Sequence, residues 1–279
     1  MSEPARIWRC GTYRLDLARP LIMGIINVTP DSFSDGGERE DPFEAVVWGE
    51  ELVAQGADII DIGGESTRPG AEAVTEMAER TRVRPVVTRL AGEGVPLSID
   101  SRHAHVAASC VEAGASIIND ISGFSDAAMV DLAAATDAGV VIMHMQGEPR
   151  TMQREPHYDD VVAEVSGYLL GQATALEAAG VARERIAVDP GIGFGKSTEH
   201  NLALLRAIPE LVEMGYPVLV GASRKRFIGD LTGEAKPRER LGGSVGVAVE
   251  AVRLGAHIVR VHDVKATRQA LTMAAAVRG

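Results

Sequence analysis

The chain has 279 residues, of which 46% are hydrophobic and 24% charged, and its formal net charge is −11 at pH 7. This length is near the roughly 250 residues of a (β/α)8 barrel, although two ordinary domains would also fit. The negative charge disfavours general binding of DNA, RNA or anionic membranes, and the low aromatic content, 4%, leaves few stacking platforms for single-stranded nucleic acid. An anionic substrate therefore needs a local cluster of cations or a metal ion.

The sequence gives no sign of export, membrane insertion or a disulfide framework. Its first ten residues contain charges and no apolar run, and no segment approaches the ~18 apolar residues of a membrane span. The two cysteines, Cys10 and Cys110, lack CxxC spacing, which argues against a zinc site. We therefore expect a cytoplasmic protein with reduced thiols.

The chain then alternates short apolar segments with Ala-rich amphipathic segments. Residues 7 to 17 predict a small hairpin, within an N-terminal extension that ends near residue 18 and covers the bottom of a barrel. Eight segments rich in Val and Ile predict strands buried on both faces: Leu21–Asn27, Asp58–Ile62, Leu97–Asp100, Ser116–Asn119, Val140–His144, Ile186–Asp189, Val218–Gly221 and Ile258–Val261. The predicted helices between them include Pro42–Gln55, Ala104–Ala113, Tyr158–Ala179 and Ser244–Leu254.

This alternation predicts one α/β domain over residues 1–279. Several predicted helices end in glycine directly before the next strand, a common helix stop signal. Strict alternation implies parallel pairing of the strands, and eight units indicate closure into a (β/α)8 TIM barrel. No GxGxxG motif follows the first strand, so a dinucleotide-binding fold has no specific support.

Polar residues gather where the predicted strands end, and barrels of this type carry their active sites there. The residues concerned are Asn27, Asp61, Asp100, Asn119, Asp120, His144, Asp189, Ser223, Arg224, Lys225, Arg260, His262 and Asp263. Capping of the following helices is the alternative interpretation. Capping explains single residues but not the whole set, because several lie within strands and some are basic.

The loops after the first two strands have the features of substrate-binding loops. The first, INVTPDSFSDGG, is long enough for a functional lid, and Asn27 at its start offers an oxygen ligand suited to Mg²⁺. The second, GGESTRPG, places Arg68 where a guanidinium can hold a phosphate. The alternatives are an ordinary loop and a glycine-rich turn with one exposed arginine.

The later strands suggest a heterocycle site next to a phosphate site. Asp100, Asn119 and Asp189 end three strands, and carboxylates accept paired N–H bonds from an edge such as that of a 2-aminopyrimidinone. Lys225 follows the seventh strand, and Arg260 lies on the eighth. Barrels of this type often bind phosphate in this region. A Schiff-base role for Lys225, as in an aldolase, leaves the Asp and Asn residues unexplained.

Seven ordered motifs lie between about residue 21 and residue 270: MGIINVTPDSFSDGG, DIGGESTRPG, SIDSR, INDISG, DPGIGFGK, GASRKRFIG and VRVHDV. Together they resemble the motifs of the dihydropteroate synthase family. The resemblance implies a transferase of folate biosynthesis that joins 6-hydroxymethyl-7,8-dihydropterin pyrophosphate to p-aminobenzoate. The products would be 7,8-dihydropteroate and pyrophosphate. It also implies a Mg²⁺ cofactor, inhibition by sulfonamides and a homodimer formed through the last helices.

The resemblance also assigns residues to three parts of a site. The pterin pocket would contain Asp100, Asn119, Met143, Asp189, Phe194, Lys225 and Arg260. The pyrophosphate would meet His262, Arg68 and Arg260, with Asn27 acting through Mg²⁺. The p-aminobenzoate pocket would contain Phe33, Thr67, Pro69 and Lys225.

The implied mechanism is dissociative: pyrophosphate leaves first, and the aniline nitrogen then attacks a pterin methyl cation. Asp35 and Asp100 would stabilise the cation, and Lys225 and Arg68 complete the catalytic set. Two positions depart from the family pattern, because Arg226 replaces a frequent serine and Ile192 an aromatic residue. A methyltetrahydrofolate-type methyltransferase and an inactive pterin-binding paralogue remain as alternatives.

Overall fold

The computed structural model describes residues 5–29, 42–66 and 74–278, and its centre is a sheet of parallel strands. These strands are β3 (Leu21–Asn27), β4 (Ile59–Gly63), β5 (Leu97–Asp100), β6 (Ile117–Asp120), β7 (Gly139–Met143), β8 (Ile186–Asp189), β9 (Leu219–Val220) and β10 (Ile258–Val261). The helices are α1 (Pro42–Ala54), α2 (Glu76–Leu90), α3 (Ala104–Glu112), α4 (Ala127–Ala135), α5 (Val161–Ala178), α6 (Thr198–Arg206), α7 (Ile208–Glu213), α8 (Arg226–Thr232), α9 (Leu241–Arg253) and α10 (Val264–Arg278). Two short 3-10 helices, η1 (Arg183–Arg185) and η2 (Pro237–Arg240), precede β8 and α9.

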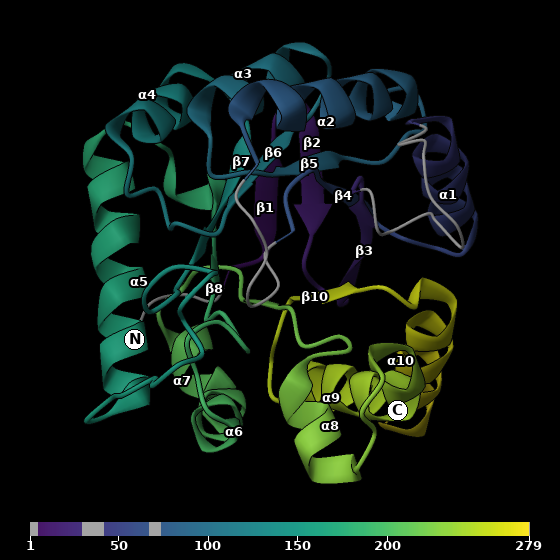
Figure 1. Ribbon diagram of the computed structural model, residues 1–279, viewed down its shortest axis with the longest axis vertical. Coiled ribbons are helices and arrows are strands. Elements are labelled where there is room, and N and C mark those ends of the chain that lie inside the picture. Colours follow the sequence, from purple (N-terminus) through teal and green to yellow (C-terminus); the bar gives the residue numbers. More distant parts are fainter. Residues whose placement is uncertain (1–4, 30–41, 67–73, 279) are drawn as a thin grey trace.

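The strands form a barrel with the helices on its outside (Figure 1). Their order is β8-β7-β6-β5-β4-β3-β10-β9, and a parallel bridge between Val188 and Val218 joins the two ends of the sheet. The predicted (β/α)8 TIM barrel is therefore confirmed for the described part of the chain.

The seventh strand is shorter than the sequence predicts. The expected segment Val218–Gly221 contributes only β9, Leu219–Val220, with Val218 paired through the bridge to β8. Pro217 precedes it and has no N–H to donate, although its carbonyl accepts from the amide of Val188 at 2.9 Å. The helix expected from Tyr158 begins at Val161, because the Asp160 carboxylate caps it by accepting from Val162 and Ala163.

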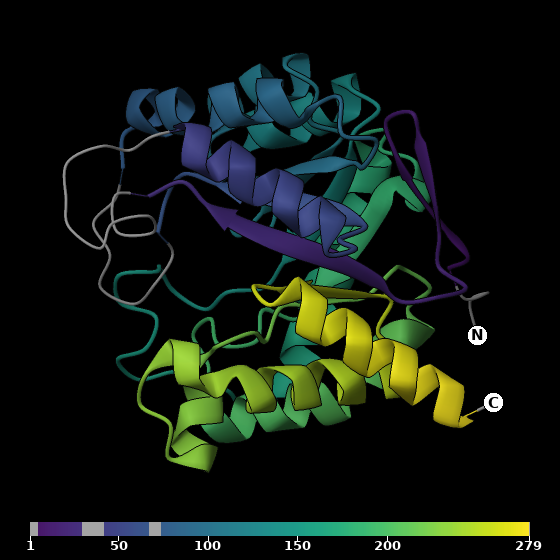
Figure 2. The same ribbon diagram turned by 90° about the vertical axis from the view of Figure 1, so that its right-hand side faces the viewer.

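A hairpin covers the amino ends of the strands, as predicted. It consists of β1 (Ile7–Cys10) and β2 (Tyr13–Asp16), which pair antiparallel. Trp8 and Cys10 are fully buried in an interior apolar cluster with residues such as Ile59 and Ile117. The indole N–H of Trp8 donates to the carbonyl of Arg185 at 2.8 Å, which fixes the hairpin at the start of β8. The carboxyl ends of the strands face the opposite side of the molecule (Figure 2).

Candidate active site at the carboxyl end of the barrel

Side chains alternate between the two faces of each strand, and this alternation decides which residues enter the barrel. In β4, Ile59 belongs to the interior apolar cluster, so Asp61, two residues later, also points inward. The same spacing holds in three further strands: Ile117 and Asn119, Ala187 and Asp189, and Ile258 and Arg260. The interior therefore carries an apolar floor with a polar layer above it.

Arg260 is the centre of this polar layer. Its Nε donates to Asp61 Oδ2 at 2.6 Å, and its Nη2 donates to Asp100 Oδ2 at 2.6 Å. Asn119 also contacts the Asp61 carboxylate, since its Nδ2 donates to Asp61 Oδ2 at 3.3 Å. Asp61 is fully buried, and the side chains of Arg260 and Asp100 are 18% and 13% exposed. The upper part of the network thus remains open to a ligand.

The charges of this network are strongly coupled. Burial raises the pKa of Asp100 to about 7, although Arg260 opposes the shift and Asp61 adds to it. Burial opposes the charge of Arg260, but the Asp61 and Asp100 carboxylates raise its pKa above the ordinary value. Arg260 therefore remains a cation, whereas Asp100 can exchange a proton near neutral pH.

A second pair, Asp189 and Lys225, lies beside this network. Asp189 is buried and accepts from the amide of Gly191 at 2.7 Å. Burial raises the pKa of Asp189, and Lys225 opposes this shift. Burial lowers the pKa of Lys225 to about 7, with Asp189 acting in the opposite direction. Lys225 Nζ donates to the Ile192 carbonyl and lies 4.1 Å from the centroid of the Phe194 ring.

The backbone that delivers Lys225 is strained at the preceding residue. Arg224 has φ 59°, a left-handed value that costs free energy for a residue with a side chain. Its amide donates to Ser244 Oγ at 2.9 Å, and its guanidinium binds both Asp263 oxygens, at 3.0 and 2.5 Å. Arg224 is therefore a structural support of the turn, and its side chain is only 26% exposed. Arg226 is the exposed residue, with 81% of its side chain accessible.

The remaining predicted residues that the structure describes lie around the same rim. Met143 ends β7, is buried, and stands in register with Asp189. His262 follows β10, with Nδ1 at 3.1 Å from Ser223 Oγ. Asn27 ends β3 and is partly exposed. Five predicted residues lie outside the described residues: Phe33, Asp35, Thr67, Arg68 and Pro69.

Hydrogen bonds and an ion pair hold the beginning of the loop that follows β4. The Gly64 carbonyl accepts from Arg82 Nη1 at 3.1 Å, and Glu65 binds the Arg102 guanidinium through both oxygens at 3.0 Å. A Cβ on Gly64 would lie 2.7 Å from Val83 Cγ1, so the turn requires glycine. Gly64 is therefore held against α2, and Glu65 is held by Arg102, which precedes α3.

The part of the chain that the structure describes contains no group of three or more His, Cys, Asp or Glu side chains arranged to hold a metal ion. Asn27 provides one amide oxygen at the rim. Among the described residues this oxygen would not hold Mg²⁺ alone, and Mg²⁺ commonly takes further ligands from water and from a substrate phosphate. The described residues therefore fit a cation that arrives with a substrate.

Two residues of the site had no predicted role. Asp61 stood among the polar strand ends but was not assigned, although its spacing of two from Ile59 in a buried strand was the available signal. Lys196 was seen only as part of a glycine-rich loop, yet it is 3% exposed and lies close to Asp189 and Lys225. Its burial had no local sequence signal.

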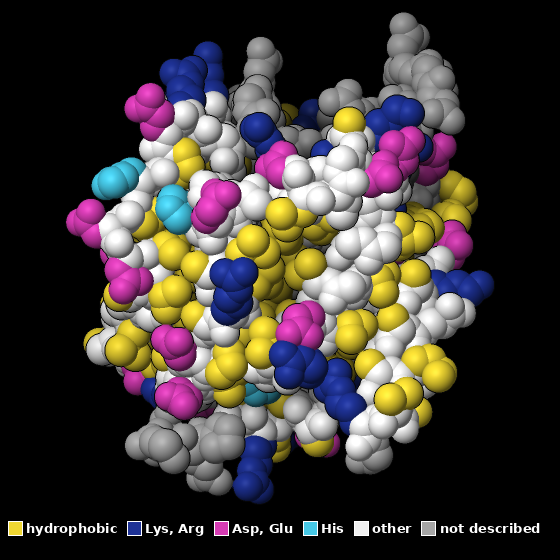
Figure 3. Space-filling view, turned by 90° about the horizontal axis from the view of Figure 1, so that it is seen from below, with side chains coloured by type: hydrophobic (Ala, Val, Ile, Leu, Met, Phe, Trp, Pro, Cys, Tyr) yellow, Lys and Arg dark blue, Asp and Glu magenta, His cyan; other side chains and the backbone are white. Residues whose placement is uncertain are grey.

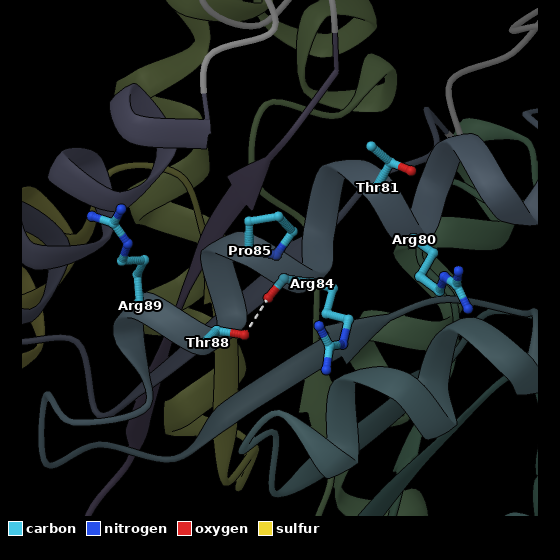
Figure 4. A pocket seen from close by; sticks show the side chains of 6 residues that line it. All are labelled: Arg80, Thr81, Arg84, Pro85, Thr88 and Arg89. Carbon is cyan, nitrogen blue, oxygen red and sulfur yellow. Dashed lines mark hydrogen bonds between the residues drawn. The ribbon is translucent and has the colours of Figure 1, made fainter.

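A hollow of about 430 Å³ lies elsewhere, on the outer face of α2. Figure 4 shows its lining, which includes Arg80, Arg84, Arg89 and Pro85, with the Thr88 hydroxyl donating to the Arg84 carbonyl at 2.9 Å. These residues come from one helix on the outside of the barrel. The hollow is therefore separate from the polar layer.

Comparisons with known proteins identify the family of the chain. The family model described as Pterin binding enzyme matches residues 23–262. The chain is 50% identical over 271 residues to dihydropteroate synthase of Neisseria meningitidis serogroup B, covering 95% of each chain.

Two solved structures are similarly close. Xanthomonas albilineans dihydropteroate synthase with 4-aminobenzoic acid has a TM-score of 0.93 and 47% identity over 99% of both chains. Yersinia pestis dihydropteroate synthase with a sulfonamide drug complex has a TM-score of 0.92 and 44% identity, over 98% of this chain and 99% of that one. The chain therefore belongs to the dihydropteroate synthase family of pterin-binding enzymes.

Proposed function

We propose that the protein is a dihydropteroate synthase, a transferase of folate biosynthesis. It joins 6-hydroxymethyl-7,8-dihydropterin pyrophosphate to p-aminobenzoate and releases pyrophosphate. The observation that carries this proposal is the interior network of Asp61, Asp100, Asn119 and Arg260 beside the Asp189–Lys225 pair. It supplies acceptors for a pterin edge and cations for its oxygen and for phosphate.

Asp100, Asn119 and Asp189 would hold the edge of the pterin ring, with Met143 and Phe194 against its apolar surface. The in-plane Nε and Nη2 donors of Arg260 are already bound by two carboxylates. The ligand would therefore meet the face of the guanidinium, which stacks well on an aromatic ring. Asp61 holds Arg260 in this orientation from the buried side.

In the proposed dissociative mechanism, the bond between the pterin methyl carbon and oxygen breaks first, and its electron pair leaves with pyrophosphate. The carboxylate of Asp100 would stabilise the positive charge that develops on the pterin, assisted by Asp35. The neutral aniline nitrogen of p-aminobenzoate then attacks the carbon and loses its proton. Electrostatic stabilisation of this kind is among the largest contributions to enzymatic rates.

The leaving group would be bound by His262, Arg68 and Arg260. Asn27 would contribute an oxygen to Mg²⁺, which when bound neutralises the developing charge on pyrophosphate. Lys225 would lie between the pterin and the p-aminobenzoate pocket of Phe33, Thr67 and Pro69. Because a sulfonamide has the shape of p-aminobenzoate, we expect sulfonamides to compete for that pocket.

We further infer a homodimer formed through the last helices. On α9, a Cβ at Gly242 or Gly246 would meet no atom within 4 Å, so a partner helix could approach closely. Leu231, Leu241 and Met273 on α8, α9 and α10 are exposed, at 58%, 41% and 62%. Figure 3 shows hydrophobic side chains interspersed with charged ones on the face seen from the side of α6 and α8.

None of the described helices is long and apolar enough to span a membrane. The location that we propose is the cytoplasm, where folate biosynthesis would find its substrates. The apolar cluster between the sheet and the helices includes residues from Ile22 to Leu271, which supports the organisation of the chain as one domain.

The test of the proposed function is product formation. Purified protein is incubated with the pterin pyrophosphate, p-aminobenzoate and Mg²⁺, and 7,8-dihydropteroate is followed by mass spectrometry. We expect product from the wild type and a sharp reduction in Asp100→Asn, which keeps the side-chain shape but removes the charge. A folded wild type that binds the pterin but forms no product would instead support the methyltransferase or inactive-paralogue alternatives.

A further inference from the structure

The segment between β8 and α6 lies directly on the end of β7. Gly191, Gly193 and Gly195 all have positive φ, at 67°, 81° and 59°. A Cβ on Gly191 would lie 1.9 Å from the carbonyl oxygen of His144, and one on Gly195 would lie 2.4 Å from that of Gln146. Only glycine permits this contact, so the two loops form one packed unit.

Lys196 forms the polar contacts inside this unit. Its Nζ lies 3.0 Å from His144 Nδ1 and donates to the carbonyls of His144 and Phe194, at 3.2 and 2.9 Å. An ammonium group has three N–H donors, so each one has an acceptor here. Burial lowers the pKa of His144 to about 3, which leaves its ring neutral and able to accept at Nδ1. The side chain of Lys196 therefore joins the two loops at a site closed to water.

The loop that Lys196 fastens supplies the immediate surroundings of Lys225. The Ile192 carbonyl accepts from Lys225 Nζ, and the Phe194 ring lies beneath the same ammonium group. Further bonds hold the loop from the same side: Gln153 Nε2 donates to the Gly193 carbonyl at 2.6 Å, and the Tyr158 hydroxyl donates to the Gly195 carbonyl at 2.9 Å. A shift of this loop would move both contacts of Lys225 together.

We propose that Lys196 is a positioning residue, which fastens residues 191–195 to the end of β7 and thereby holds the Ile192 carbonyl and the Phe194 ring against Lys225. The kinetic consequence of this inference rests on the proposed function, whereas the contacts themselves do not. Lys196 acts through Lys225 and has no predicted contact with a substrate.

Besides burial, Lys225 contributes to the lowered pKa of Lys196, and because repulsion between two like charges is mutual, Lys196 acts on Lys225 as well. Both ammonium groups face the Asp189 carboxylate, and Lys225 additionally faces Arg260 and Asp100. Burial lowers the pKa of Lys196 to about 7, with Asp189 opposing the shift and Lys225 adding to it. Removal of the Lys196 charge would therefore make Lys225 easier to protonate.

The experiment compares Lys196→Met, Lys196→Gln and the control Lys236→Met in protein labelled with ¹³C,¹⁵N-lysine. The chain contains four lysines, so each variant assigns its own resonance. Lys236 is a matched control because its side chain is 78% exposed and forms a surface ion pair with Glu239. The readouts are the Lys225 side-chain resonance as a function of pH, the melting temperature, and kcat/KM for dihydropteroate formation.

We expect Lys196→Met to move the Lys225 resonance, raise the midpoint of its titration, and lower kcat/KM by about 10- to 100-fold, as expected for a displaced catalytic group. Lys196→Gln keeps two N–H donors, so it should recover part of kcat/KM while the shifted midpoint persists. A folded Lys196→Met or Lys196→Gln protein with the wild-type Lys225 titration and wild-type kcat/KM would overturn the inference. If the wild type forms no dihydropteroate, the proposed function fails, but the Lys225 resonance still decides the positioning role.

Discussion

The barrel contains one inward-pointing arginine at each end, and the two arginines have opposite surroundings. Arg260, at the carboxyl end, donates to the carboxylates of Asp61 and Asp100. Arg185, at the amino end, is 5% exposed and donates to the backbone carbonyls of Ala133 and Ala138, at 2.6 to 2.9 Å. Burial lowers the pKa of Arg185, whereas the carboxylates raise that of Arg260.

This difference supports the proposal that ligands bind at the carboxyl end of the barrel and that the amino end provides structural support. Backbone carbonyls cannot rearrange without opening the barrel, so Arg185 ties the end of α4 and the start of β7 to β8. Carboxylates on strand ends can exchange partners or protons when a ligand arrives, and Asp100 has a pKa of about 7. We therefore propose that the amino end of the barrel stabilises the fold and that the carboxyl end carries the active site.

The largest effect is expected from Arg260→Met. It would remove the cationic partner of the buried Asp61 and of Asp100, and removal of one partner from a buried pair typically costs about 3–5 kcal/mol of unfolding free energy. Urea unfolding measures this loss, and product formation should fall by about 10²–10³-fold, as for the removal of one preorganised electrostatic group. Adding Asp61→Asn should restore part of the stability but not the activity. A stable, fully active single variant would contradict the role assigned to Arg260.

Arg185→Met should lower the stability of the protein but leave its activity nearly unchanged. The carbonyls of Ala133 and Ala138 would lose their donors, which costs about 1–3 kcal/mol for each unsatisfied buried group. We expect a lower urea midpoint with kcat/KM of the folded enzyme within about twofold of the wild type, because the site lies at the other end of the barrel. A large loss of kcat/KM without a loss of stability would show that the two ends are not separate.

A pH-dependent effect should come from Asp100, whose pKa is raised from 3.8 to about 7 by burial. Between these values the folded state binds more protons than the unfolded state, so this group makes the protein less stable as the pH rises. The difference in unfolding free energy between wild type and Asp100→Asn should therefore fall from about pH 4 to about pH 7 and then level off. Denaturant titrations across this range measure it. A difference that rises with pH would show that the folded protein favours the Asp100 anion.

The smallest effect is expected from Arg226→Ser, which introduces the residue frequent in the family. The Arg226 side chain is exposed, and its Nε lies 3.6 Å from Asp230 Oδ1, one turn later in α8. Surface pairs of this kind contribute about 0.3–0.5 kcal/mol. Stability should change within that range, and the KM for p-aminobenzoate, from initial rates, should change by less than about threefold, or ~0.7 kcal/mol. A larger change would give position 226 a direct role in benzoate binding.

The sequence predicted the barrel well because its signals are local and repeated. Four strands, including Leu21–Asn27 and Leu97–Asp100, have the predicted bounds, since buried β-branched runs end at polar residues. The strand before β10 was overestimated, because pairing at Val218 depends on Pro217 and on neighbours far along the chain.

The site was predicted less completely than the fold. Asp100, Asn119, Asp189 and Arg260 lie together as expected, because strand ends converge in a barrel. The fully buried Asp61 was not assigned, since a lone Asp at a strand end also fits a helix cap. The role of Lys196 depends on acceptors 52 residues away in sequence at His144, which no local pattern reveals.

The most direct test of the separation between the two ends is pterin binding. Calorimetric titration with 6-hydroxymethyl-7,8-dihydropterin is carried out on folded wild type, Arg185→Met and Arg260→Met. The account predicts equal affinity for wild type and Arg185→Met, and a loss of about tenfold or more, at least ~1.4 kcal/mol, for Arg260→Met. Equal affinity in all three proteins, or a loss confined to Arg185→Met, would contradict it.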